Sequence, residues 1–367
     1  MSTSDTLHVR VRRAIAAGDL SPAAFDEIAL DLARFQADSV PPFGKLCKAR
    51  GVDLTKASVA DVPALPTDAF RYARIASHPE TEDVRVFRTS GTTRGELRGQ
   101  HPFRTLETYE AAALAWAMPC LFPGLRPERA IALVPDPSVV DDSSLSFMVQ
   151  LFIDRLGMSA TFALSLERGV DVAAVERAAE EARRAGSPTM VLSTAFGLAL
   201  LLDAIGDRRL QLPERSRVMV TGGFKGRTRE IPSAELYART AQALGIAERD
   251  IVGEYGMTEL SSQLYEPRLA EDPPSAPGTY RPPPWLRVEA ADPETLRVLP
   301  RGSEGIARFV DLANVDSVGF VQTLDWVSVD ERGDVRLFGR APGAEPRGCS
   351  LALEDLFGDR SHRGPAA

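Results

Sequence analysis

Long hydrophobic runs are absent from this chain. Although 44% of its 367 residues are hydrophobic, no apolar run approaches the ~20 residues of a transmembrane helix. The first residues, from Met1 to Asp5, contain no apolar core of a signal peptide. We therefore expect a protein that has no membrane span and works in the cytoplasm.

Cysteine and histidine are also scarce. The cysteines, Cys47, Cys120 and Cys349, are odd in number and far apart, which argues against a disulfide framework and against a zinc site. The histidines show no metal-ligand spacing. The net charge of −8 argues against nonspecific binding to nucleic acid. These absences exclude disulfide-rich, zinc-binding and nucleic-acid-binding proteins, and they leave reduced thiols as the expectation.

Lysine is the rarest of the charged residues. Lysine and arginine together number 43, yet the lysines are only Lys45, Lys48, Lys56 and Lys225. Codon bias in a GC-rich genome explains the skew toward arginine. Any reaction step that needs a lysine therefore has very few candidates.

What the chain does have is a loop rich in glycine and hydroxyl groups after a strand-like stretch at residues 84–87. The loop consists of Thr89, Ser90, Gly91, Thr92, Thr93, Arg94 and Gly95. Glycine lets backbone N–H groups converge on an anion, and the hydroxyl groups supply further donors. The pattern indicates a phosphate-binding loop; a surface turn is the alternative for this pattern taken alone.

Two further segments follow short apolar stretches, as ligand-binding loops follow buried strands. One occupies residues 254–259 after Ile251 and Val252, and the other occupies residues 221–226 after residues 218–220. Open α/β sheets bind ligands at the carboxyl ends of their strands. The first segment offers an aromatic face, a glycine, a hydroxyl group and a carboxylate suited to Mg²⁺. Ordinary strand-to-helix and glycine turns remain the alternatives.

Helical and strand-like segments alternate along the chain, which predicts an α/β fold. Residues 1–50 fit two amphipathic helices. The next expected elements are helices at 106–118, ended by Pro119, and at 172–185, with strands at 130–134 and 190–192. A proline-rich stretch then leads into strands expected at 286–288, 305–310, 318–323 and 334–338. These last strands predict a smaller β-rich subdomain.

In this order, the three loop segments resemble the motifs of the adenylate-forming superfamily, whose members activate carboxylic acids with ATP. They are most similar to those of LuxE-type acyl-protein synthetases. The likeness extends over most of the chain, from about residue 60 to about residue 355. Its further segments are residues 66–70, 143–148, 221–227 and 348–350. The resemblance implies the N-terminal core of these enzymes, with layered α/β sheets and a small β-rich subdomain.

The resemblance also implies ATP as a substrate, Mg²⁺ as a cofactor and a role for each motif. The loop from Thr89 to Gly95 would hold phosphates, and Glu259 would bind Mg²⁺. The remaining nucleotide-binding residues would be Gly222, Gly223, Glu254, Tyr255, Gly256 and Thr258, with Asp325 on the ribose hydroxyls and Arg340 beside it. Arg94 departs from the family pattern, which has glycine there. A turn aspartate and a surface ion-pair partner are the alternatives for Asp325 and Arg340.

Gly339 and Arg340 resemble the hinge that precedes a mobile C-terminal domain in the superfamily. The chain ends soon after, at residue 367, so we expect that domain to be missing or vestigial. The expected segments are an N-terminal helical segment at 1–60, an α/β core at 61–275, a β-rich subdomain at 276–340 and a tail at 341–367. Lys225 is the candidate to replace the lysine of the mobile domain; a solvated loop lysine is the alternative.

Cys349 stands where the family carries its acyl group as a thioester. The implied function is an ATP-dependent ligase that adenylates a fatty or aromatic carboxylic acid and captures the acyl group on Cys349. An acyl reductase or a carrier protein would then accept it. His101 is a further catalytic candidate, for binding phosphate or orienting the acid, whereas Cys47 and Cys120 are expected in the core.

Two other functions stay open. A stand-alone adenylating enzyme or CoA ligase would not use Cys349 and would pass the acyl group to a diffusible acceptor. A noncatalytic nucleotide-binding subunit is favoured by Arg94 and by the missing lysine domain. The presence of Glu259 and Asp325 argues against this last function.

Overall fold

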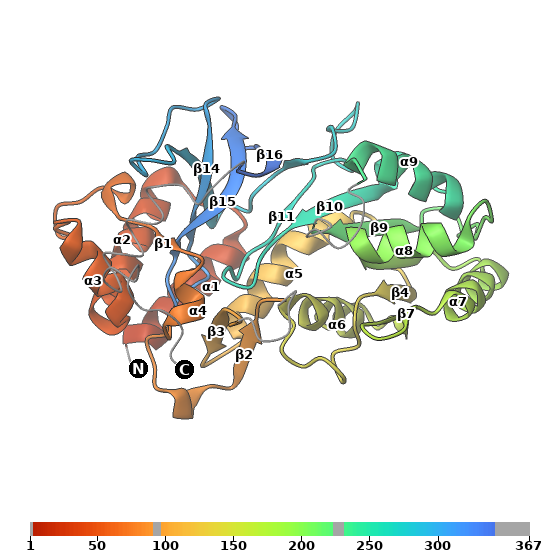
Figure 1. Cartoon of the computed structure of the whole chain (residues 1–367), viewed down its shortest axis with the longest axis horizontal. Helices are drawn as coiled ribbons and strands as arrows, with labels where there is room; N and C mark the ends of the chain where they lie inside the picture. The colour runs from red at the N-terminus through yellow and green to blue at the C-terminus, as the bar shows by residue number, and fades with distance from the viewer. Residues whose placement is uncertain (1–2, 91–96, 223–230, 342–367) are drawn as a thin grey trace, which may run out of the picture. The chain divides into compact units, whose positions relative to one another are not determined.

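The computed structural model describes residues 3–90, 97–222 and 231–341 (Figure 1). These residues form two compact units. The first unit comprises the described parts of Met1–Ala112, Met257–Ser262 and Pro282–Ala367, and the second those of Ala113–Gly256 and Gln263–Arg281. The division into four segments expected from the sequence stays a prediction.

The second unit contains a mostly parallel sheet with the strand order β11–β10–β9–β8–β4–β5. The bounds are β4 Arg129–Leu133, β5 Ser159–Phe162, β8 Thr189–Thr194, β9 Arg217–Thr221, β10 Ile251–Tyr255 and β11 Leu264–Tyr265. All neighbouring pairs are parallel except β10 and β11. The central strand β8 is buried from Thr189 to Ser193, as expected for a parallel strand that is covered on both faces.

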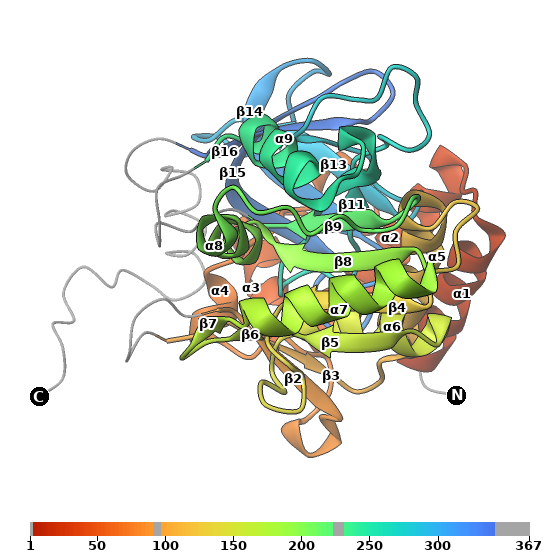
Figure 2. The same cartoon turned by 90° about the vertical axis from the view of Figure 1, so that its right-hand side faces the viewer.

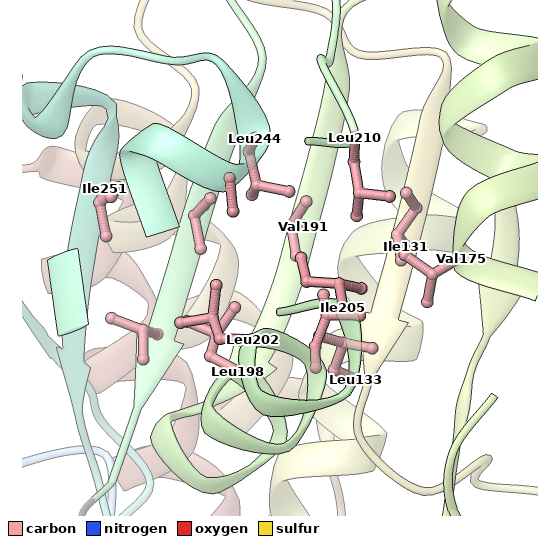
Figure 3. Close-up of a cluster of buried hydrophobic side chains, with 14 of the residues drawn as sticks. Ile131, Leu133, Val175, Val191, Leu198, Leu202, Ile205, Leu210, Leu244 and Ile251 are labelled. Carbon is pink, nitrogen blue, oxygen red and sulfur yellow. The ribbon is translucent and has the colours of Figure 1, made fainter. Parts of the chain in front are cut away.

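Three helices, α7 (Val172–Ala185), α8 (Ala195–Ile205) and α9 (Ser233–Leu244), cover one face of this sheet (Figure 2). Alternate strand residues supply the sheet side of the core, because side chains two apart share a face. Ile131 and Leu133 of β4 lie in one buried cluster with Leu198 and Leu202 of α8 (Figure 3). The α/β fold predicted from alternating segments is confirmed.

Other elements of the second unit connect the strands of the sheet. They are α6 (Ser144–Leu156), between β4 and β5, and the short strands β6 (Leu164–Ser165) and β7 (Gly169–Val170), between β5 and β8; the short strand β12 (Thr279–Tyr280) follows β11. Side chains cap two helices where the sequence changes from loop to helix. The Ser143 hydroxyl accepts from the Ser146 N–H at 3.2 Å, and the Asp171 carboxylate accepts from the Ala174 N–H at 2.9 Å. Such caps satisfy N–H groups that the first helical turn leaves without partners.

The first unit contains an antiparallel sheet in which β13, β14, β15 and β16 are successive neighbours. Their bounds are Leu286–Ala291, Glu304–Asp311, Phe320–Val329 and Val335–Arg340. Strand β1 (Leu65–Pro66) adds to β15 in parallel. The unit also contains α4 (Ala69–Tyr72) and an antiparallel hairpin of β2 (Arg85–Arg88) and β3 (Gln100–Phe103). The β-rich segment expected after the prolines is therefore present.

The N-terminal region forms three helices where two were expected: α1 (Thr3–Ala17), α2 (Pro22–Ser39) and α3 (Pro41–Ala49). The third helix begins directly after Val40, whose N–H still donates to the Gln36 carbonyl at 2.8 Å. Pro41 suits a first helical position because the N–H that it lacks would have had no partner in the helix. Phe43 and Leu46 are buried along this helix.

Helix α5 (Glu107–Leu121) continues through Pro119, so the expectation that this proline ends the helix is wrong. Proline removes one N–H donor from a helix. Here the residue lies in the last turn, and the Phe122 N–H still donates to the Met118 carbonyl at 3.2 Å.

In the described part of the chain, no helix is long and apolar enough to cross a membrane.

Candidate functional site

The β2–β3 hairpin holds the described ends of the predicted phosphate loop. Just after β2, the Thr89 N–H donates to the Gly99 carbonyl at 3.0 Å. In return, the Gly99 N–H donates to the Thr89 hydroxyl oxygen at 2.9 Å. The structure thus describes Thr89 and Ser90. The other predicted loop residues, Gly91, Thr92, Thr93, Arg94 and Gly95, lie outside the described residues.

Glu259 and Thr89 both lie close to Gly99. A Cβ atom placed on Gly99 would lie 3.1 Å from Thr89 Cγ2 and 3.5 Å from Glu259 Oε1. The lack of a side chain at position 99 thus lets a hydroxyl group and a carboxylate flank one backbone position. Glu259 is only 8% exposed. The structure therefore brings the first residue of the predicted phosphate loop close to the predicted metal ligand.

This pair suits the chemistry of Mg²⁺. Proteins typically hold Mg²⁺ by one or two carboxylates, with water and substrate phosphates completing the coordination. One carboxylate beside a phosphate loop meets that requirement. In the stretches that the structure describes, no three or more His, Cys, Asp or Glu side chains gather into a metal site.

His101 contacts the backbone of the motif that carries Glu259. Its Nδ1 lies 2.7 Å from the carbonyl oxygen of Thr258, and the ring is 1% exposed. Burial lowers the pKa of His101 from 6.5 to about 4, so the ring is neutral near neutral pH. Because a carbonyl can only accept, Nδ1 carries the proton. This geometry suits a residue that positions the motif.

In the second unit, Glu254 and Thr221 end neighbouring parallel strands. They are register partners of β10 and β9, and the Thr221 hydroxyl donates to the Glu254 carboxylate. Burial raises the pKa of Glu254 from 4.5 to about 7, although the hydrogen bond from Thr221 opposes that rise. The carboxyl edge of the sheet thus carries a carboxyl group that titrates near neutral pH.

Tyr255 and Gly256 follow Glu254 directly. The Tyr255 ring lies 5.8 Å from the Tyr280 ring, centroid to centroid. A Cβ atom on Gly256 would lie 2.5 Å from Glu254 Oε1, so a side chain at this position would displace the carboxyl group. Gly222, just after β9, has a φ of +70°, in the left-handed region that favours glycine. Predicted nucleotide-binding residues thus flank the ends of two adjacent strands.

Asp325 and Arg340 are register partners of β15 and β16. Arg340 Nε lies 3.4 Å from Asp325 Oδ1, and the two side chains are 78% and 18% exposed. The strand expected at residues 318–323 runs instead from Phe320 to Val329, so Asp325 lies within it and not in a turn. Its continuation buries Val327 and Val329, which gives the physical reason for the longer strand.

The remaining sequence candidates lie outside the described residues: Gly223, Lys225 and Cys349. The two described cysteines have environments that disfavour reactivity. Burial raises the pKa of Cys47 to about 11 and that of Cys120 to about 12. A thiol that stays protonated is a poor nucleophile. Cys47 belongs to the core as expected, whereas Cys120 is only half-buried.

Sequence patterns did not single out two polar residues that contact the motifs, Asp311 and Asn314. Thr221 was predicted as the first residue of a ligand-binding segment, but its hydrogen bond to Glu254 was not predicted. Asp311 accepts from the Ser261 and Ser262 N–H groups, each at 2.9 Å. Asn314 Nδ2 donates to the Glu259 carbonyl at 2.8 Å. No local pattern marks these last contacts, because each joins residues about fifty positions apart.

Comparisons with known proteins point to one family. The family model described as "Acyl-protein synthetase, LuxE" matches residues 24–358. The long-chain-fatty-acid–luciferin-component ligase of Vibrio harveyi is 32% identical over 88 residues, which are 22% of this chain and 23% of that protein. The chain thus matches less than a quarter of the length of this relative.

Solved structures share the fold. A 2-hydroxyisobutyryl-CoA ligase in a postadenylation state has a TM-score of 0.62 at 16% identity, with 88% of this chain and 69% of that chain covered. ATP-bound MatB from Rhodopseudomonas palustris has a TM-score of 0.51 at 17% identity, with 78% of this chain and 51% of that chain covered. The fold expected from the motifs is confirmed as that of the adenylate-forming enzymes.

Proposed function

Because the chain belongs to the LuxE acyl-protein synthetase family, we propose that it activates a carboxylic acid with ATP and transfers the acyl group to a cysteine thiol. The observation that carries this proposal is the family match over residues 24–358. The position of Glu259 beside Thr89 supports it independently, because a metal-binding carboxylate and a phosphate loop must lie close together in such an enzyme.

The reaction has two steps. In the first, an oxygen of the substrate carboxylate attacks the α-phosphorus of ATP; a new O–P bond forms, and the bond to the leaving pyrophosphate breaks. In the second, the thiolate of Cys349 attacks the acyl carbonyl; a C–S bond forms, the C–O bond to AMP breaks, and the thiol proton goes to solvent. An acyl reductase or a carrier protein then accepts the acyl group.

The residues of the first unit would bind phosphate, metal and ribose. Thr89 and Ser90, with the loop that follows, would donate to the phosphates. Glu259 would hold Mg²⁺, which offsets the charge that gathers on the phosphate oxygens. Asp325 would accept hydrogen bonds from the ribose hydroxyls. Arg340 lies 3.4 Å from this carboxylate and would help to orient it.

In the second unit, the candidate residues are those for the base. Tyr255 offers an aromatic face for adenine, and Gly222 and Gly256 allow a close approach of the backbone. Glu254 would lie beside them at the strand ends. Lys225 is our candidate for the cation that assists adenylation. In the first unit, His101 would act by holding the Thr258 backbone and not by contact with the substrate.

The substrate would be a fatty acid, and a long-chain acid is the first to test. The relative from Vibrio harveyi carries such an acid in its name, which supports this choice over an aromatic acid. The cytoplasm would supply the ATP and the reducing conditions that keep Cys349 a thiol.

Intact-protein mass spectrometry tests the proposal directly. Wild type and Cys349→Ala are incubated with ATP, Mg²⁺ and a panel of fatty and aromatic acids. We expect an ATP-dependent, hydroxylamine-labile adduct in wild type alone, with pyrophosphate release in both. Pyrophosphate release without an adduct would instead favour a stand-alone adenylating enzyme or CoA ligase. The absence of both would favour a noncatalytic nucleotide-binding subunit.

A further inference from the structure

We infer that Asp311, Asn314 and His101 are positioning residues that hold the backbone on both sides of Glu259 and thereby set the affinity of the site for Mg²⁺-bound nucleotide. This inference rests on the proposed function, because it takes Glu259 as the metal ligand. All these residues belong to the first unit.

Asp311, at the end of β14, fixes the backbone that follows Glu259. Its Oδ2 accepts from the Ser261 and Ser262 N–H groups, each at 2.9 Å. Its Oδ1 accepts from the Ser262 hydroxyl at 2.7 Å and from the Ala313 N–H at 2.9 Å. Burial raises the pKa of Asp311, and these donors oppose that rise. A buried carboxylate with four donors holds its partners firmly, since moving any of them would leave a polar group without a partner.

Asn314 fixes the backbone of Glu259 itself. Its side chain is buried and Nδ2 donates to the Glu259 carbonyl at 2.8 Å and to the Val318 carbonyl at 3.0 Å. The amide thus links the loop between β14 and β15 to the motif. Because an amide NH₂ group has two protons, both are used in these two bonds. Replacing Asn314 would therefore remove a hydrogen bond to the Glu259 backbone.

His101 fixes the backbone that precedes Glu259. Its Nδ1 donates to the Thr258 carbonyl at 2.7 Å. The ring packs against Phe103, with centroids 4.3 Å apart, and against Phe70, with centroids 5.8 Å apart. Aromatic contacts on two sides restrict the ring, so the hydrogen bond has a fixed direction. The three side chains together hold four backbone positions around Glu259.

The loop that carries Asn314 is itself braced from other elements. Gln36 of α2 donates through Nε2 to the Asn314 and Val315 carbonyls, at 2.7 and 3.1 Å. Its Oε1 accepts from the Gly319 N–H at 3.0 Å. Because the loop cannot shift easily, Asn314 provides a stationary support for Glu259. Groups that support a metal ligand typically change metal affinity ~10- to 100-fold when they are removed.

Two isosteric variants separate positioning from stability. Asn314→Asp replaces the donating NH₂ group with a carboxylate oxygen, which would face the Glu259 and Val318 carbonyl oxygens without a proton to donate. Gln322→Glu makes the same change at a buried amide whose Nε2 donates to the Ala307 and Thr323 carbonyls, at 2.8 and 3.4 Å, and not to the Glu259 motif. Titration calorimetry measures the binding of ATP to the full chain with Mg²⁺ and with EDTA. We expect Asn314→Asp to weaken Mg²⁺-ATP binding ~10- to 100-fold and to leave metal-free ATP binding unchanged. Gln322→Glu should leave both unchanged.

A second variant covers the case in which Asn314→Asp does not fold. His101→Phe keeps a ring against Phe70 and Phe103 and removes the donor to Thr258. We expect it to weaken Mg²⁺-ATP binding by about 10-fold, again with metal-free ATP unchanged. The inference is overturned if both variants bind Mg²⁺-ATP like wild type, or if Gln322→Glu weakens it equally.

Glu259→Gln distinguishes the inference from the proposal on which it rests. If this variant weakens Mg²⁺-ATP binding whereas Asn314→Asp and His101→Phe do not, only the positioning inference fails. If Glu259→Gln binds Mg²⁺-ATP like wild type, Glu259 is not the metal ligand and both fail. Weakened binding in all three variants, with metal-free ATP unchanged, supports both.

Discussion

Thr221 donates its hydroxyl hydrogen bond to Glu254 at the point where their two strands end. The carboxyl group is deeply buried. Burial, together with the charges of Glu266 and Glu254, raises the pKa of the Tyr280 hydroxyl group. Removal from water disfavours the charged Glu254 carboxylate, while the Thr221 hydroxyl group favours it. The balance leaves Glu254 close to half ionised near neutral pH, which makes the stability of the fold depend on pH.

We expect wild type to lose stability relative to Glu254→Gln as the pH rises. The folded-state pKa of Glu254, about 7, lies above the ordinary value of 4.5, so the unfolded chain releases its proton first. The contribution of this group to the free energy of unfolding is fully present below the ordinary pKa. It is lost as the pH rises from the ordinary pKa to the folded-state pKa. The difference between wild type and variant should fall by roughly 3 kcal/mol between about pH 4 and about pH 8. Urea unfolding at a series of pH values measures it, and a pH-independent difference would contradict the assignment.

We expect Asp325 to recognise the ribose of the nucleotide. Asp325→Ala should weaken the binding of ATP ~10- to 100-fold, because it removes hydrogen bonds to a charged acceptor. Wild type should also prefer ATP over 2′-deoxy-ATP, and the variant should have lost that preference. Asp330→Ala, at an exposed aspartate that accepts from the Arg332 N–H at 2.9 Å, provides the matched control. Equal loss of affinity for both nucleotides in Asp325→Ala, with the preference kept, would rule out the ribose contact.

Gly253, one residue before Glu254, has no room for a side chain. A Cβ atom there would lie 2.6 Å from Glu266 Cδ and 2.8 Å from the Tyr237 hydroxyl oxygen. We expect Gly253→Ala to lower the free energy of unfolding by about 2–3 kcal/mol. Tyr237→Phe removes one of the two obstructing groups, so the double variant should lose less than the sum of the single variants. Additive losses in urea unfolding would show that the obstruction does not involve Tyr237.

Asp316 joins α1 to the loop between β14 and β15. It pairs with His8 at 2.8 Å and accepts from the Ser77 hydroxyl at 3.0 Å. Burial alone would raise the pKa of Asp316, but His8, Ser4 and Arg104 outweigh it and hold the pKa well below its usual range. Asp316→Asn should therefore cost about 3 kcal/mol of unfolding free energy at neutral pH.

The pH dependence of this loss provides its check. A lowered folded-state pKa contributes stability that is present above the ordinary value of 3.8 and is lost as the pH falls below it. Wild type should thus keep its advantage over Asp316→Asn down to about pH 4 and lose it progressively below. Asp19→Asn, at an exposed position just after α1, should differ little from wild type throughout. An advantage that already vanishes near neutral pH would contradict the charged pairing.

The fold class was predictable because its signals are local. Apolar stretches such as residues 130–134 and 190–192 predicted buried parallel strands. The loop segments predicted after residues 218–220 and 251–252 begin at the ends of β9 and β10. The third N-terminal helix was missed because Pro41 and Pro42 look like a break, although proline is compatible with a first helical turn. The length of β15 was missed because a polar residue, Asp325, occurs within it.

Only those residues of the candidate site that lie within a sequence motif could be predicted. Glu259 and Thr89 were found separately, but their approach across Gly99 depends on the folded hairpin. The contacts of Asp311 and Asn314 with the motif could not be predicted, because these residues are common in turns and nothing nearby in the sequence marks their partners. Such support comes from tertiary structure and has no periodic signature.

The three-part composition of the first unit constrains the order of events during synthesis. His8 meets Asp316 and Leu65 pairs with Val321, so the N-terminal helices and β1 need partners that the ribosome produces some 250 residues later or more. The second unit has most of its sheet within the single stretch Ala113–Gly256. The strands of this sheet are therefore all synthesised before the partners of the N-terminal helices. Until those partners are synthesised, the apolar faces of α1 to α3 that contact them stay uncovered. A chaperone that protects those faces early in translation should therefore raise the yield of folded protein.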